Sequence, residues 1–269
     1  MGVSRLRALG AFACMLALFA FTAFAYTAAQ LEAVATGELI PEINAAAGIA
    51  LAKSYAGTKT EDYLKDLAAN GLTIGLRTAA SGALSIIWTG KVSAKTMTEA
   101  DLTAIINDAK VAEMVRVAAI DPMVQVLFIA KTAAVLKTMA TDATATHESR
   151  LAAAKAYYIK ARTTVSIVNI PALEKAAVTS DSAELAYAAG ETLGGWYLSF
   201  APKTQAEYET LAISGSSEGL RVAGKVALTP LLLSTSVTDL ETKLLDVLNI
   251  KSAEYRQAYQ DALAYQFGL

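Results

Sequence analysis

The residues that could do chemistry by type and spacing begin with a serine between glycines. Gly215-Ser216-Ser217-Glu218-Gly219 has the Gly-x-Ser-x-Gly form of a nucleophile elbow, in which a serine hydroxyl stands exposed on a strained strand-to-helix turn. The context does not fit, because no strand pattern precedes it. The single histidine, His147, also lies upstream of Ser217, whereas that hydrolase order places histidine last. We therefore expect a Ser/Gly loop, a solvated histidine and no catalytic site.

A second group with the spacing of a known site follows directly. Gly219, Gly224 and Lys225 match the glycines and lysine of a phosphate-binding loop. Val226 stands where that loop needs a hydroxyl for magnesium, and no strand leads into the segment. Glycines at a helix start or a packing contact explain the pattern better, and no cofactor is predicted.

Residues that bind metals are sparse in this chain. Its only cysteine is Cys14 and its only histidine is His147, so carboxylates remain as ligands. The nearest groups, Glu61-Asp62 and Asp239 with Glu241, do not match the twelve-residue calcium loop. Such charges are typical of helix entrances, and we predict no metal site.

Two lysines offer a weaker hypothesis. Lys95 and Lys203 each stand beside an expected helix N-terminus, where unpaired backbone amides favour anions, so each could hold a carboxylate or a phosphate. The alternative interpretation is a lysine that keeps a loop soluble.

The C-terminus is rich in tyrosine. Tyr255 and Tyr259 are one helical turn apart, and Phe267 continues the same stripe. Such a helix usually docks on its own core. The alternative is an aromatic contact to a neighbouring subunit, since tyrosine and phenylalanine are favoured at interface centres.

Helices are predicted to position all of these residues. Apolar residues recur at helical spacing almost throughout, and Val165 to Ile170 is interpreted as the end of a helix before Pro171. Capping boxes and polar residues before proline predict where helices begin. These entrances are Thr58 with Glu61, Thr96 with Glu99, Thr204 with Glu207, Thr238 with Glu241, Asp121-Pro122 and Thr229-Pro230. The predicted fold class is all-α, an Ala-rich multi-helix bundle.

An internal similarity suggests how the bundle is organised. Trp88 and Trp196 lie 108 residues apart, and Gly82 and Pro122 recur at the same offset as Gly190 and Pro230. This pattern predicts a tandem duplication of a helical unit of about 108 residues, with the two copies sharing one core. The predicted units are 26–143 and 144–269, the second including a C-terminal helix, and a threonine-rich stretch separates them. The tetratricopeptide pattern is rejected, because its 34-residue period is absent from the sequence.

The N-terminus carries a targeting signal. Residues 1–25 combine Arg5 and Arg7, an apolar run and a small-x-small site at Ala23-Phe24-Ala25, which predicts a signal peptide. An uncleaved anchor is the alternative, and it would be the chain's one contact with a membrane. Either way, we expect a location in the periplasm, on the cell surface or outside the cell.

Composition narrows the classes of function. With 54% hydrophobic and 18% charged residues the chain is expected to fold, and its interspersed charges, net −2, exclude the electrostatic footprint of a nucleic-acid-binding protein. The sequence predicts a non-enzymatic exported structural or interaction protein, whose partner is another protein or a second copy. The alternative is a binding protein that holds an apolar or lipid-like ligand between the two halves.

Overall fold

A computed structural model describes residues 26–37, 40–163, 169–247 and 252–268, and all regular structure in these ranges is helical. The prediction of an all-α multi-helix bundle is confirmed. The predicted signal peptide lies outside the described residues, as does most of the segment from Val165 to Ile170. The helices are α2 (Ala28–Thr36), α3 (Pro41–Thr58), α4 (Glu61–Asn70), α5 (Ile74–Ser93), α6 (Glu99–Asn107), α7 (Glu113–Ala118), α8 (Ile120–Ala130), α9 (Ala133–Ala140), α10 (His147–Thr163), α11 (Ile170–Thr179), α12 (Ala183–Phe200), α13 (Gln205–Ser214), α14 (Glu218–Leu232), α15 (Val237–Val247) and α16 (Ala253–Phe267).

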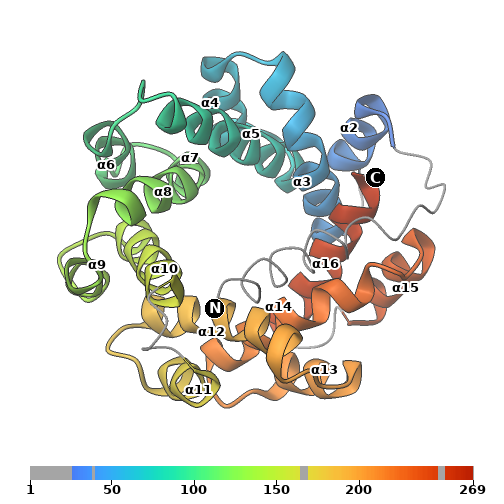
Figure 1. Ribbon diagram of the computed structural model, residues 1–269. Coiled ribbons are helices and arrows are strands. Elements are labelled where there is room, and N and C mark those ends of the chain that lie inside the picture. Colours follow the sequence, from blue (N-terminus) through green and yellow to red (C-terminus); the bar gives the residue numbers. More distant parts are fainter. Residues whose placement is uncertain (1–25, 38–39, 164–168, 248–251, 269) are drawn as a thin grey trace, which may run out of the picture.

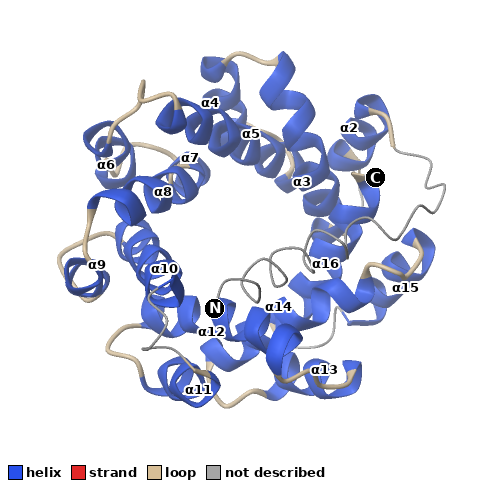
Figure 2. Ribbon diagram, in the orientation of Figure 1, coloured by secondary structure: helices blue, strands red, loops and turns tan. Residues whose placement is uncertain are grey.

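These helices form a closed ring of two layers (Figure 1). Helices α3, α5, α7 with α8, α10, α12, α14 and α16 follow one another around the inside, and α16 contacts α3, which closes the ring. Helices α2, α4, α6, α9, α11, α13 and α15 lie outside, and each packs on the inner helix that follows it in the chain. Short loops join the two layers (Figure 2).

The ring is therefore built from helix pairs, and the expectation that no period near 34 residues is present is wrong. In the second half the residues that cap the inner helices, Thr146, Ser182, Ser217 and Ser252, are spaced 36, 35 and 35 residues apart. The offset of 108 residues corresponds to three such steps, since α12 is the third inner helix after α5. A separate duplication of the 108-residue unit stays a prediction.

Alanine makes this dense packing of helices possible. The buried residues of both predicted halves belong to one hydrophobic cluster, in which inner helices contribute runs such as Ala152, Ala153 and Ala154, all with 0% exposure. A methyl side chain lets a helix approach its neighbours on both sides and the outer layer behind it, because it occupies little space between the backbones.

Two predicted helix starts are wrong by two residues. The caps are Thr60 and Thr98, not Thr58 and Thr96, and their hydroxyls accept bonds from the first-turn amides. Thr58 and Thr96 instead donate to carbonyls at the end of the preceding helix. A threonine hydroxyl can serve either helix, so spacing alone could not separate the two roles.

The other two capping boxes had different outcomes. Thr204 and Glu207 form the predicted box at the start of α13, which is confirmed. Thr238 lies inside α15, and Ser236 provides the hydroxyl that binds the amide of Asp239.

The prolines also differ from prediction. Pro122 stands in the first turn of α8, where Ala119, not Asp121, is the cap. Because proline clashes with the carbonyl four residues earlier, it accounts for the break between α7, which ends at Ala118, and α8. Pro230 lies inside α14 near its end and starts no helix. Ile170 begins α11 instead of ending a helix.

Candidate functional site

The polar groups that the fold brings together lie where the inner helices begin. An arginine of one inner helix pairs with a glutamate of the next. The arginine stands four residues after the cap of its own helix, and the glutamate stands two residues after the cap of the next helix. The pairs are Arg116–Glu148, Arg150–Glu184, Arg221–Glu254 and Arg256–Glu42. We call each such arginine–glutamate pair a clasp and each contact between neighbouring inner helices a joint. Inner helices joined by a clasp start side by side at the same end of the ring.

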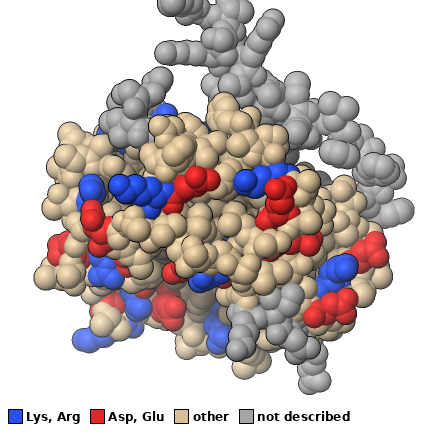
Figure 3. Space-filling view, turned by 90° about the horizontal axis from the view of Figure 1, so that it is seen from below, with Lys and Arg blue, Asp and Glu red and all other residues tan. Residues whose placement is uncertain are grey.

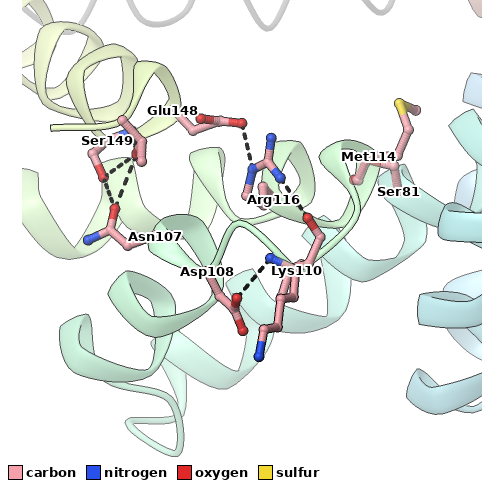
Figure 4. A network of polar contacts seen from close by, with 10 residues as sticks. Ser81, Asn107, Asp108, Lys110, Met114, Arg116, Glu148 and Ser149 are labelled. Carbon is pink, nitrogen blue, oxygen red and sulfur yellow. Dashed lines mark hydrogen bonds and ion pairs between the residues drawn. The ribbon is translucent and has the colours of Figure 1, made fainter.

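Figure 4 shows one such clasp in detail. The Nε of Arg116 donates to Glu148 at 2.9 Å, and its Nη1 donates to the backbone carbonyl of Val111 at 2.6 Å. Beside it, the hydroxyl of Ser149 donates to Asn107 at 3.1 Å. One guanidinium thus joins the next inner helix to the loop before its own helix, as a planar group with several fixed donors can do.

The clasp at Glu184 is the most deeply buried. Its side chain is 4% exposed, and the same carboxylate oxygen accepts from the Nε and Nη2 of Arg150 at 3.0 and 2.8 Å and lies 2.9 Å from the Nδ1 of His147. Burial by itself would raise the pKa of Glu184, but the hydrogen bonds from Arg150, its own backbone amide and His147 outweigh burial and hold the pKa below its ordinary value. His147 contacts this carboxylate through a side chain that is 65% exposed, in agreement with the expected solvated histidine.

Glycines replace the charged pair at two other joints. Gly75 and Gly219 occupy the position where the clasps have glutamate. A Cβ on Gly48 would lie 2.2 Å from the carbonyl oxygen of Gly75, and one on Gly190 would lie 2.0 Å from that of Gly219. Backbones in contact leave no room for a guanidinium between α3 and α5 or between α12 and α14. The prediction that Gly219 and Gly224 are packing glycines is confirmed, since a Cβ on Gly224 would meet the Ala212 amide at 2.4 Å.

Ser217 is the cap of α14. Its hydroxyl accepts from the Leu220 amide at 3.2 Å and donates to the carbonyl of Ala177 in α11 at 2.8 Å. Thr73 and Ser252 bond in the same way to the carbonyls of Ala35 and Ala212. The serine of the Gly-x-Ser-x-Gly string thus occupies a repeated position that holds an inner helix to a neighbouring outer helix.

Replacing Ser217 with alanine is expected to lower the free energy of unfolding by about 2 kcal/mol, about 1 for the lost cap and about 1 for the carbonyl left without a donor. Ser182→Ala is the matched control, because Ser182 caps α12. Its loss should cost about 1 kcal/mol. Urea denaturation of both variants measures the difference, and equal losses would contradict the role assigned to the bond with Ala177.

The two lysines of the hypothetical anion sites lie in different settings. Lys95 follows the end of α5 in a left-handed conformation, φ 60°, three residues before the cap of α6. Lys203 directly precedes the cap of α13, and its ammonium lies 5.1 Å from the ring centre of Tyr197. The structure does not bring the two lysines into equivalent positions, and anion binding stays a hypothesis.

The aromatic residues of the C-terminal helix face the protein's own core. Tyr255, Tyr259 and Phe267 are 6%, 3% and 1% exposed. The two tyrosine hydroxyls lie 3.2 Å apart, and the ring of Phe267 packs edge-on against that of Tyr26 at 5.0 Å. Burial raises the pKa of Tyr255 and Tyr259. An interface made by these side chains would require α16 to leave its place, and that role stays a prediction.

Among the described residues, pockets open to solvent include the two that follow. One of about 260 Å³ is lined by His147, Leu151, Ala183, Glu184, Tyr187 and Glu218. Another of about 280 Å³ lies between α9, α10, α11 and α12 and is lined by Lys137, Tyr157, Tyr158, Ala172, Lys175, Ala176, Thr179, Ser180, Asp181 and Leu185. The second lies where the two predicted halves meet, and its lining mixes aromatic, charged and hydroxyl groups.

Charges are distributed in pairs elsewhere as well. On the inner layer the ammonium of Lys155 lies 3.2 Å from Glu191 and 5.8 Å from the ring centre of Tyr187. Figure 3 shows basic and acidic side chains next to one another over the visible side of the ring. Among the described residues, no group of three histidine, cysteine or acidic side chains lies close enough to hold a metal ion.

Comparisons of the chain with models of protein families, with curated proteins and with solved structures found no match. In the described part of the chain, no helix is both long enough and apolar enough to cross a bilayer.

Sequence reasoning missed the clasps, although a signal for them was present. The string capping residue-x-Glu-x-Arg occurs as Thr146-x-Glu148-x-Arg150 and again as Ser252-x-Glu254-x-Arg256. Read with Ser217 and Gly219, it would have marked the starts of the inner helices and the period of about 35 residues.

Proposed function

We propose that this chain is a non-enzymatic exported scaffold that acts by protein interaction, with another protein or with further copies of itself. The observation that carries the proposal is that side chains of reactive types make contacts between helices. Ser217, His147, Glu184 and Arg150 each contact a neighbouring helix or its cap.

The architecture supports the same conclusion. A closed array of helix pairs is held together by contacts between nearest neighbours, and such arrays present extended surfaces of fixed shape. Four arginine–glutamate pairs and two glycine contacts recur at the same register positions around the ring, so a few residue types determine most of its shape.

A second candidate function is the binding of an amphiphilic small molecule. The pocket between α9, α10, α11 and α12, about 280 Å³, is slightly smaller than the usual range for ligand pockets. Lys137 and Asp181 at its edge, 2.9 Å apart, favour a ligand with a polar group over a purely apolar one.

Light scattering after size exclusion, followed by native mass spectrometry, tests both candidates on the exported protein. If the scaffold proposal is correct, we expect masses of two or more times that of one chain, or a bound protein that co-purifies. A monomer that carries a bound small-molecule mass would favour the second candidate. Labelling of Ser217 by a serine-directed covalent inhibitor would contradict the non-enzymatic proposal.

A further inference from the structure

The joint between α5 and α7 has an arginine without a glutamate. Arg77 stands four residues after Thr73, the cap of α5, which is the arginine position of the clasps. Met114 stands two residues after Ala112, the cap of α7, where the clasps have glutamate. Figure 4 shows Met114 beside Ser81 of α5, whose hydroxyl donates to the Met114 carbonyl at 2.7 Å. This joint therefore has a thioether at the position where a clasp has a carboxylate.

The stem of Arg77 is placed like that of a clasp arginine. A Cβ on Gly71 would lie 3.1 Å from the Cγ of Arg77, and one on Gly215 would lie 3.2 Å from the Cγ of Arg221. Each arginine thus packs on the glycine six residues before it. Arg221 binds Glu254 of the next inner helix, with 3.3 Å between Nε and the carboxylate oxygen. Arg77 therefore leaves α5 in the same way as an arginine that forms a clasp.

The guanidinium of Arg77 has no partner of its own. In the described part of the chain it makes no hydrogen bond and no ion pair, although the residue is half-buried. The first acidic residue of α7, Glu113, is exposed and does not pair with it. A guanidinium has five donors in a fixed plane, so a carboxylate that two of these donors can reach binds it well. Arg77 is thus half of a clasp that lacks its anion.

Leu72 indicates what kind of molecule would bring the anion. It lies between Gly71 and the cap of α5, and 94% of its side chain is exposed. A free carboxylate ion would gain nothing from this side chain. A protein segment could cover Leu72 and bring a carboxylate to Arg77 at the same time, and arginine is enriched at protein interfaces.

We propose that the joint between α5 and α7 binds an aspartate or glutamate side chain of a partner protein. The carboxylate pairs with the guanidinium of Arg77, and an apolar side chain of the same partner covers Leu72. The clasps support this chemistry, because in each of them an arginine at the same position holds a glutamate carboxylate. The inference rests on the proposed function, since it names the group by which the scaffold recognises its partner.

Filling the site from within the chain tests its geometry. Met114→Glu adds the missing carboxylate and should melt at a higher temperature than Met114→Gln, which has the same shape without the charge. With Arg77→Met in the same chain the order should reverse, because the new carboxylate then has no partner. The four proteins form a double-mutant cycle, measured by thermal denaturation. Equal melting temperatures of the two Met114 variants, with and without Arg77, would overturn the proposed geometry.

A small carboxylate tests the site in the unmodified protein. The probe is propionate, which matches the end of a glutamate side chain, and propionamide is the neutral control. Carbon-detected NMR follows the arginine side chains, and the Arg77 signal is assigned by its loss in Arg77→Lys. Propionate should shift this signal until it saturates, propionamide should not, and Met114→Glu should respond to neither. An equal shift at Arg162, an exposed arginine of α10, would show general attraction between anions and cations and overturn the site.

The partner is tested on any complex that light scattering and native mass spectrometry detect. Arg77→Met and Met114→Glu should each weaken its affinity by about tenfold or more, and Arg162→Met should not. Leu72→Ala should also weaken it while the response to propionate is unchanged. A complex of equal affinity in all of these variants would overturn this inference and leave the proposed function standing. If the chain forms no complex at all, the proposed function fails, and a propionate response confined to Arg77 would still support a carboxylate site.

Discussion

Gly190→Ala is expected to destabilise the protein by about 2 kcal/mol. A Cβ at this position would lie 2.0 Å from the carbonyl oxygen of Gly219, a backbone atom that cannot turn aside, so α12 and α14 would have to move apart. Overpacking of this kind costs about 3 kcal/mol, and the better helix propensity of alanine returns about 1 kcal/mol. Thermal denaturation should show a melting temperature lower by about 4 to 8 °C.

The same helix provides the control. A Cβ on Gly195 meets nothing within 4 Å, so Gly195→Ala should stabilise the protein by about 0.5 to 1 kcal/mol through helix propensity alone. The two substitutions are chemically identical and five residues apart in α12. If Gly190→Ala is as stable as Gly195→Ala, the close contact between α12 and α14 is not what holds this joint.

Arg150→Met is expected to cost about 3 kcal/mol at neutral pH, because it leaves the buried carboxylate of Glu184 without its main partner. Lys137→Met removes the exposed pair with Asp181, whose side chains are 52% and 63% exposed, and should cost less than about 1 kcal/mol. Urea denaturation of both variants provides the comparison. Equal losses in the free energy of unfolding of the two variants would show that the buried clasp contributes no more to stability than the exposed pair.

The pH dependence gives an independent readout of the same substitution. In the unmodified protein the folded pKa of Glu184 is depressed, so its contribution to stability is present above the unfolded pKa and lost as pH falls through the folded value. Without Arg150, burial is opposed only by the backbone amide of Glu184 and by His147, so the pKa is depressed less and the variant loses less stability as pH falls. The difference in free energy of unfolding between the unmodified protein and Arg150→Met should therefore become smaller as the solution is acidified. A gap that is independent of pH would mean that Glu184 is not the group affected.

These two predictions concern two of the ways in which inner helices are joined. One joint brings backbones into contact through glycine, and the other places a guanidinium and a carboxylate between helices at the same register positions. A joint made through glycine loses stability when atoms are added, and a clasp loses stability when one of its two charges is removed. The scaffold proposed here therefore depends on a few positions at the starts of the inner helices more than on its many alanines.

The sequence by itself determined the secondary structure class and much of the local detail. Helical periodicity predicted an all-α protein, because apolar spacing depends only on neighbours along the chain. The capping box at Thr204 and Glu207 was correct for the same reason. The absence of a strand before Ser217 also argued correctly against the context that a nucleophile elbow needs.

Only the tertiary structure decided how the helices close into a ring and what the polar residues do there. Whether Thr58 and Thr96 end one helix or begin the next depends on where the chain arrives in space, which local spacing does not encode. Arg256 and Glu42 stand at opposite ends of the described chain, and they pair because ring closure brings α16 to α3. The recurring string that contains Arg256 could mark the start of an inner helix, but which glutamate this arginine pairs with was decided only by closure of the ring.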